Sequence, residues 1–88
     1  MEIPDELIAD MIPAVREQMT MPDMAYVADC LQRLTEKEGL EEAEAMELMA
    51  QALAITVNDM MVTGKAFDTA KYKSLLKSLP MLPDEQES

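Results

Sequence analysis

Apolar residues recur along this chain at intervals of three and four positions, which is the spacing of amphipathic helices and not of strands. The first such segment covers residues 4–19, and Asp5 and Glu6 in its first turn suit the positive end of a helix dipole. Its apolar positions are Leu7, Ile8, Met11, Ile12, Val15 and Met19. Pro13 interrupts the pattern, because proline removes one backbone hydrogen bond and clashes with the preceding turn. We therefore expect a helix over 4–19 that is kinked at Pro13 or divided there into two short helices.

A second helix is predicted over residues 22–38. Pro22 suits a first helical turn, and Thr20 and Asp23 have the spacing of a capping box, with aspartate in the place of the usual glutamate. The apolar stripe of this segment consists of Met24, Val27, Ala28, Leu31 and Leu34. Gly39 follows the segment, and glycine readily takes the left-handed conformation that ends a helix.

The third segment, residues 41–62, is predicted to be the central helix. It opens with the acidic run EEAEAME, which suits a helix N-terminus, and residues 45–62 then include 13 apolar residues in 18. The apolar positions form two adjacent stripes, one of Met46, Met49, Leu53, Val57 and Met60 and one of Leu48, Ala52, Ile55 and Val62. A helix that is apolar around most of its circumference must be covered on several sides. We expect the other helices, or a second subunit, to cover it.

A fourth helix over residues 68–79 has the clearest start signal in the chain. Gly64 ends the preceding helix, and Asp68 is a favourable N-cap. Phe67 and Tyr72, which flank this cap, have the spacing of a hydrophobic staple. The predicted buried side of the helix consists of Tyr72, Leu75, Leu76 and Leu79.

These segments predict an all-α protein with a single small domain of about four helices over residues 1–79. Pro80 stops the last helix, and we expect residues 80–88, a short acidic tail, to be extended or disordered. A length of 88 residues leaves room for one domain only. Because the chain has three aromatic residues and ten methionines, the core must consist largely of aliphatic side chains and flexible thioethers.

The charge of the chain limits its partners. Its 18 acidic and 7 basic residues give a net charge of −11, which disfavours nucleic acids and anionic membrane surfaces. One cysteine excludes an internal disulfide, and the sequence contains neither a secretory signal nor an apolar run long enough to span a bilayer. We therefore expect a cytoplasmic protein.

Several short motifs follow one another between residues 20 and 82. They are Pro22, Tyr26-Val27, Leu31-Gln32-Arg33-Leu34, Gly39-Leu40, Glu42-Ala43-Glu44-Ala45, Gly64-Lys65-Ala66-Phe67-Asp68, and the Y-x-x-L-L-x-x-L-P run from Tyr72 to Pro80. In this order they resemble a group of small, uncharacterised bacterial all-helical domains, a domain of unknown function. Members of that group often carry histidines in a pattern like H-E-A-x-H after the G-L turn, where this chain has Glu44-Ala45-Met46-Glu47. The resemblance therefore implies a fold, and it implies neither a metal site nor an activity.

Three thioethers lie close together in the stretch MTMPDM, at Met19, Met21 and Met24. Such spacing is typical of copper(I) sites, because soft thioether sulfur selects soft ions, and Cys30 could add a thiolate. A second interpretation assigns Met19 and Met24 to the ends of two apolar stripes, with Met21 in the turn. We favour this second interpretation, which places Cys30 on the flank of its helix as a small hydrophobic residue or a partly exposed thiol.

Six glutamates form an acidic run around the start of the predicted third helix. They are Glu36, Glu38, Glu41, Glu42, Glu44 and Glu47. Hard cations bind clustered carboxylates, but the EF-hand loop pattern is absent, and di-iron bundles need histidine, which this chain lacks. We expect this run to be a solvated face.

The sequence contains no recognisable catalytic set. A serine or cysteine nucleophile normally needs a histidine base, and the serines Ser74, Ser78 and Ser88 lie late in the chain. None of them lies in the D-S-L attachment motif of acyl carriers, and no glycine-rich phosphate loop is present. We expect no enzymatic activity and no cofactor.

The preferred functional hypothesis is a helical interaction or accessory module that binds a protein or a second copy of itself. Its candidate interface consists of Met60, Met61 and Val62, because methionine-rich helix faces adapt to partners and the third helix has surplus apolar surface. Two alternatives stay open. One is a copper(I) binder that uses Met19, Met21 and Met24, and the other is a small-ligand carrier with a methionine-lined groove.

Overall fold

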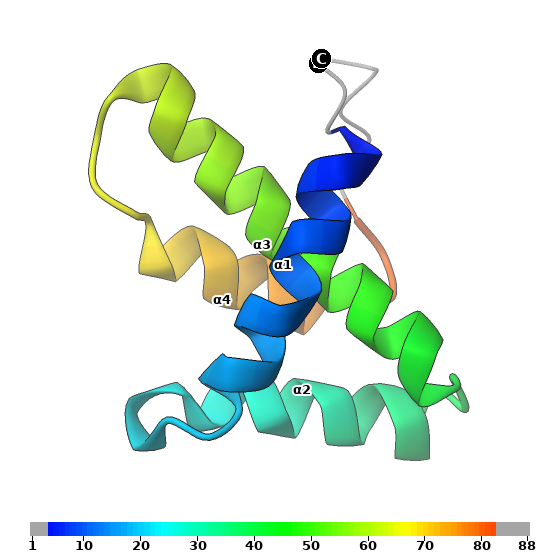
Figure 1. Ribbon diagram of the computed structural model, residues 1–88. Coiled ribbons are helices and arrows are strands. Elements are labelled where there is room, and N and C mark those ends of the chain that lie inside the picture. Colours follow the sequence, from blue (N-terminus) through cyan, green and yellow to red (C-terminus); the bar gives the residue numbers. More distant parts are fainter. Residues whose placement is uncertain (1–3, 83–88) are drawn as a thin grey trace.

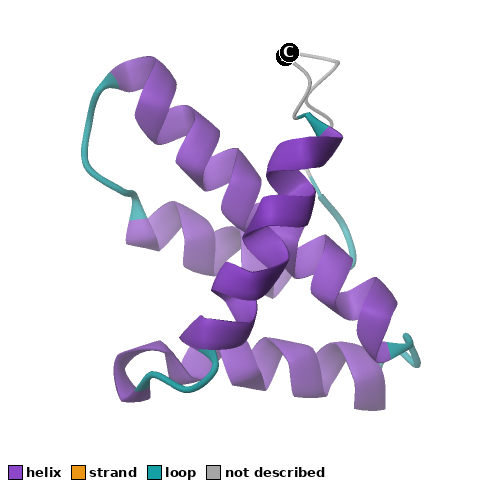
Figure 2. Cartoon of the chain, viewed as in Figure 1, coloured by secondary structure: helices purple, strands orange, loops and turns teal. Residues whose placement is uncertain are grey.

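The described part of the chain, residues 4–82, forms four α-helices in the predicted order and contains no strand (Figure 1, Figure 2). These residues are the ones that the computed structural model describes. The helices are α1 (Asp5–Gln18), α2 (Ala25–Glu36), α3 (Glu42–Thr63) and α4 (Thr69–Ser78), and a single 3₁₀ turn, η1 (Pro22–Met24), precedes α2. The Cα radius of gyration is 12.4 Å, close to the ~12 Å expected for a compact chain of this length.

The long helix α3 is the centre of the fold, as predicted. It contacts all three other helices, and α1 crosses its middle (Figure 1). Its buried residues, which cover most of its circumference, are Ala45, Met46, Met49, Ala50, Ala52, Leu53, Ala54, Ile55 and Thr56. The one polar residue among them is satisfied locally, because the Thr56 hydroxyl donates to the Ala52 carbonyl at 2.9 Å. The buried residues of α3 therefore all lie between Ala45 and Thr56, and the residues from Val57 onward are half-buried or exposed.

Helix α1 is continuous through Pro13, so the predicted alternative of two short helices is wrong. Pro13 and Ala9 both lie on the exposed side of the helix. The carbonyl of Ala9 loses its usual backbone donor at this point, and water can replace that donor there. The opposite side of α1 faces the core, where Val15 is fully buried against the other helices.

The turn between α1 and α2 differs from the prediction. The capping box of Thr20 and Asp23 does not form, because the Thr20 hydroxyl donates to the Glu17 carbonyl at 2.7 Å and so belongs to the end of α1. Pro22 begins a 3₁₀ turn, and the α-helix starts only at Ala25.

Both glycines end helices in the left-handed conformation, as predicted. Gly39 and Gly64 each have a φ of 72°, which is unfavourable for residues with a Cβ atom. After Gly39, the Leu40 N–H donates to the Leu34 carbonyl at 3.1 Å, and the Gly64 N–H itself donates to the Met60 carbonyl at 2.9 Å. These bonds occupy carbonyls that the helix ends leave without an intrahelical partner.

The predicted start of α4 is confirmed in both of its parts. The Asp68 carboxylate accepts a hydrogen bond of 3.0 Å from the Lys71 N–H, which makes Asp68 the N-cap. The rings of Phe67 and Tyr72 then meet edge to face, with centroids 5.8 Å apart. This hydrophobic staple fixes the direction in which the chain enters α4.

Tyr72 joins three helices in the core. It is fully buried in α4, its ring meets that of Tyr26 from α2 edge to face at 6.1 Å, and its hydroxyl donates to Gln18 Oε1 of α1 at 2.6 Å. Burial raises the pKa of the Tyr72 phenol well above its ordinary value. Tyr72 therefore packs as a neutral residue.

The first residues after α4 still pack against the core, although the predicted helical domain ends at residue 79. Leu79 is buried, and Leu82 is half-buried against the core, whereas Met81 between them is exposed. The predicted tail of residues 80–88 falls on residues 83–88 for the most part, and these lie outside the described residues.

Candidate functional site

The three methionines of MTMPDM lie at the predicted corner between α1 and α2. Met19 and Met24 are half-buried and pack against the core, as expected for the ends of two apolar stripes. Met21, in the turn, is 41% exposed.

Of the two alternatives predicted for Cys30, a small hydrophobic residue or a partly exposed thiol, the structure has the first. The residue is 5% exposed, and its thiol donates to the Leu76 carbonyl of α4 at 3.5 Å. It is buried because α4 packs directly over this face of α2. Burial raises the pKa of the Cys30 thiol, and the nearby Arg33 guanidinium only partly opposes this effect. The thiol is therefore protonated at neutral pH.

The acidic run lies on the surface. All six glutamates, Glu36, Glu38, Glu41, Glu42, Glu44 and Glu47, are exposed. Within residues 4–82, no three side chains of cysteine, aspartate or glutamate come together in a group that could hold a metal ion. One of the glutamates has a structural role, since the Glu41 N–H donates to the Glu44 carboxylate at 3.4 Å at the start of α3.

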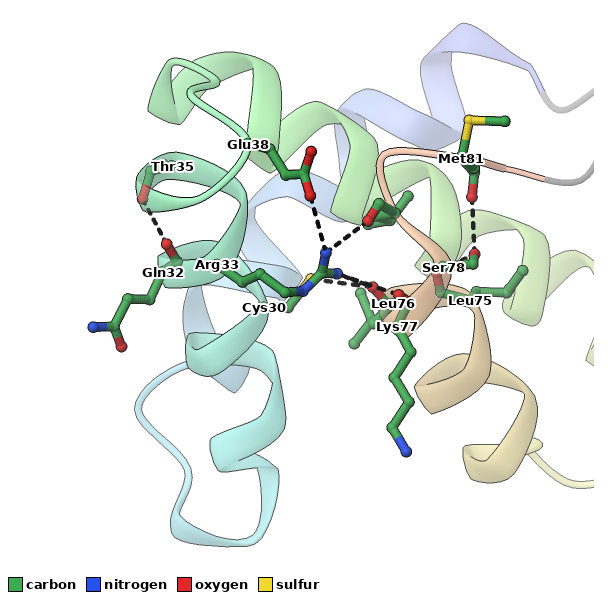
Figure 3. A network of polar contacts seen from close by, with 11 residues as sticks. Cys30, Gln32, Arg33, Thr35, Glu38, Leu75, Leu76, Lys77, Ser78 and Met81 are labelled. Atoms are coloured by element: carbon green, nitrogen blue, oxygen red, sulfur yellow. Dashed lines mark hydrogen bonds and ion pairs between the residues drawn. The ribbon is translucent and has the colours of Figure 1, made fainter.

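Arg33 is a structural residue that the sequence analysis missed. Figure 3 shows its side chain reaching from α2 to the end of α4, where the two Nη atoms donate to the carbonyls of Leu79 and Leu76, each at 2.8 Å. A longer bond of 3.5 Å reaches the Lys77 carbonyl, and the Glu38 carboxylate lies 4.0 Å away. Carbonyls at the end of a helix lack intrahelical donors and carry the negative end of its dipole. Arg33 therefore caps α4 from a neighbouring helix.

A groove of about 410 Å³ lies between α2 and α4, beside this cap. Its lining consists of Tyr26, Asp29, Cys30, Arg33, Lys73, Leu76 and Lys77. Three of the chain's seven basic residues are in this set, together with one carboxylate, so the groove is locally cationic on a protein of net charge −11. The Lys73 ammonium lies 4.9 Å above the Tyr26 ring, which joins the two walls by a cation–π contact. No methionine lines this groove.

The predicted interface residues lie at the end of α3. Met60 is half-buried, whereas Met61 and Val62 are 61% and 62% exposed. In Figure 1 this end of α3 and the connection to α4 stand at the edge of the fold, away from α2. Beside it, the Lys71 ammonium lies 3.5 Å from the Asp59 carboxylate and ties α4 to the last turns of α3. The three candidate residues thus form one continuous helical end, only partly covered by the rest of the protein.

Among residues 4–82, no helix combines the length and the apolar character that crossing a bilayer requires. No family model, no curated protein and no solved structure matches this chain. The resemblance to uncharacterised bacterial helical domains therefore stays a prediction.

Proposed function

We propose that this protein is a non-enzymatic interaction module that self-associates through the C-terminal end of α3. The observation that carries the proposal is the pair Met61 and Val62, adjacent apolar side chains that are each about three-fifths exposed. The other large apolar side chains of α3 are buried or half-buried, so its exposed apolar surface is concentrated at one end. Adjacent exposed apolar residues at such an end favour an interface.

Energetics indicate that such an interface is weak. Complete burial of a methionine or valine side chain contributes about 1.5–3 kcal/mol, and these two side chains have roughly three-fifths of that left to gain. In a two-fold symmetric dimer the burial of these four side chains contributes roughly 4–7 kcal/mol. The loss of translational and rotational freedom on association costs about 4–15 kcal/mol. The half-buried Met60 adds to the favourable side. We therefore expect a dimer that forms only at high protein concentration.

The absence of a catalytic step is part of the proposal. The chain contains no histidine, its one thiol is buried with a raised pKa, and the carboxylates of the acidic run are exposed. Groups of these kinds are poor candidates for acid–base or nucleophilic chemistry at neutral pH. A cytoplasmic location, where the single thiol stays reduced, also belongs to the proposal.

Light scattering coupled to size exclusion tests self-association directly. The unmodified chain is expected to show a rising average mass as its concentration increases from the micromolar into the millimolar range. A double variant, Met61→Gln with Val62→Thr, should stay monomeric at the same concentrations. Met81→Gln is the matched control, because Met81 is also exposed but lies after α4. A monomer at every concentration, or an equal mass in all three proteins, contradicts the proposal.

A further inference from the structure

The groove between α2 and α4 reverses the charge of the protein locally. Lys73 and Lys77 stand one helical turn apart on α4, and both are exposed. Arg33 faces them from α2, and Asp29 is the one carboxylate in the lining.

Arg33 contributes a fixed positive charge to this groove. Its guanidinium is held by bonds of 2.8 Å to two backbone carbonyls, so its position does not depend on a partner. The carbonyls carry only the partial negative charge of a helix end, and the Glu38 carboxylate 4.0 Å away is partly exposed, so these groups compensate the guanidinium charge only in part. Lys73 is likewise held over the Tyr26 ring, which is partly exposed and adds an apolar wall.

We propose that this groove binds a short acidic segment of a partner protein. Charge complementarity carries the assignment. A net charge of −11 repels anions at long range, but salt screens exposed charges beyond about 8 Å at physiological ionic strength. A short segment inside the groove is therefore closest to the three basic groups, and it makes local ion pairs with them.

The spacing of the cations specifies the kind of acidic segment. Lys73 and Lys77 are four residues apart in one helix, which places their Cβ atoms about 5–6 Å apart on one face. A partner helix with glutamates at the same spacing matches both ammonium groups at once. A long polyanion such as a nucleic acid extends past the groove onto the acidic surface, where it is repelled. The volume, about 410 Å³, also suits a few side chains better than a folded domain.

Fluorescence anisotropy with a labelled helical peptide tests the inference. The probe carries glutamates four residues apart, and a second peptide carries glutamines in their place. The glutamate peptide should bind the unmodified chain. Its affinity for the double variant Lys73→Glu with Lys77→Glu should be lower by a factor of about ten or more. Lys37→Glu with Lys65→Glu is the matched control, because it makes the same change of net charge at two exposed lysines outside the groove. This control should change binding by less than about threefold.

Three results overturn the inference. They are equal binding of the two peptides, equal weakening by both double variants, and tighter binding of a single-stranded oligonucleotide than of the glutamate peptide. If circular dichroism shows that the lysine-to-glutamate variant does not fold, Lys73→Gln with Lys77→Gln takes its place with the same expected direction. The measurement is repeated in protein that also carries Met61→Gln and Val62→Thr, where the same result is expected because binding does not depend on self-association.

Discussion

At the scale of single residues, Arg33 connects distant parts of the chain. Its partners Leu76 and Leu79 lie more than forty residues later, and each accepts a bond of 2.8 Å. A guanidinium can make these two bonds together because its donors form a planar fork. Hydrogen bonds from charged donors are worth about 1.5–3 kcal/mol each when buried, and exposure lowers that value. The Arg33 side chain is 31% exposed.

Replacing Arg33 by methionine should lower the free energy of unfolding by about 2 kcal/mol, because two carbonyls at the end of α4 lose their donors. Chemical denaturation measures this loss. Arg33→Lys should recover only part of it, since one ammonium cannot reproduce the fork. Arg16→Met is the control, because Arg16 is exposed on α1. Equal losses for the two methionine variants would mean that the cap does not stabilise α4.

Tyr72 makes the stability of the protein fall as the pH rises through the alkaline range. Burial raises its pKa above the ordinary value of 10.0, so the folded protein holds the phenolic proton at a pH where the unfolded chain releases it. By linkage, unfolding becomes more favourable as the pH rises above about 10. Tyr72→Phe should reduce this dependence, and the buried Cys30 thiol, whose pKa is also raised, should account for what remains. The same variant should cost about 1 kcal/mol at neutral pH through loss of the bond to Gln18.

Urea denaturation at a series of pH values between about 8 and 11 measures the alkaline dependence. Tyr26→Phe serves as the control, because Tyr26 is half-buried and this change keeps its ring while leaving the buried Tyr72 phenol in place. An unchanged alkaline slope in the Tyr72→Phe variant would contradict the role assigned to Tyr72.

At the scale of helices, boundaries are set by short-range hydrogen bonds at the ends. Asp68 and Gly64 act within a few residues of their own positions, and the structure has both as predicted. Thr20 shows how such a prediction fails. A capping box needs the Thr20 hydroxyl to accept from a backbone N–H that follows it. In the structure the hydroxyl instead donates to the Glu17 carbonyl that precedes it.

Asp68→Ala should lower the free energy of unfolding by about 1 kcal/mol, because the Lys71 N–H loses its acceptor at the start of α4. Asp68→Asn should keep most of the stability, since an amide oxygen also accepts this bond. Thermal unfolding followed by circular dichroism at 222 nm, a wavelength set by the helical backbone, compares the variants. A neutral Asp68→Ala variant would show that α4 does not depend on this cap.

Features that join distant helices could not be read from the sequence. The apolar spacing predicts each helix and the central place of α3, because both depend on local periodicity. The burial of Cys30 depends on where α4 packs, and so does the α2–α4 groove. Arg33 stands between Leu31 and Leu34 of the predicted stripe, and helical periodicity alone does not predict that its side chain reaches α4. The exposed end of α3, in contrast, follows from having more apolar surface than three short helices can cover.

At the scale of the whole molecule, a net charge of −11 acts against self-association. Two copies that meet through Met61 and Val62 bring like charges together, and this repulsion weakens as salt is added. Apolar contacts do not weaken under the same conditions. Binding of an acidic peptide in the α2–α4 groove rests on attraction and therefore responds to salt in the opposite direction. The salt concentration therefore distinguishes binding at the end of α3 from binding in the α2–α4 groove.

The most direct test of the central claim is sedimentation equilibrium of the unmodified chain over a series of sodium chloride concentrations. Self-association through the end of α3 predicts a monomer–dimer equilibrium whose dimer fraction rises with salt. The Met61→Gln and Val62→Thr double variant should remove that dimer at every salt concentration. A protein that stays monomeric throughout, or a dimer that the double variant leaves intact, would contradict the account.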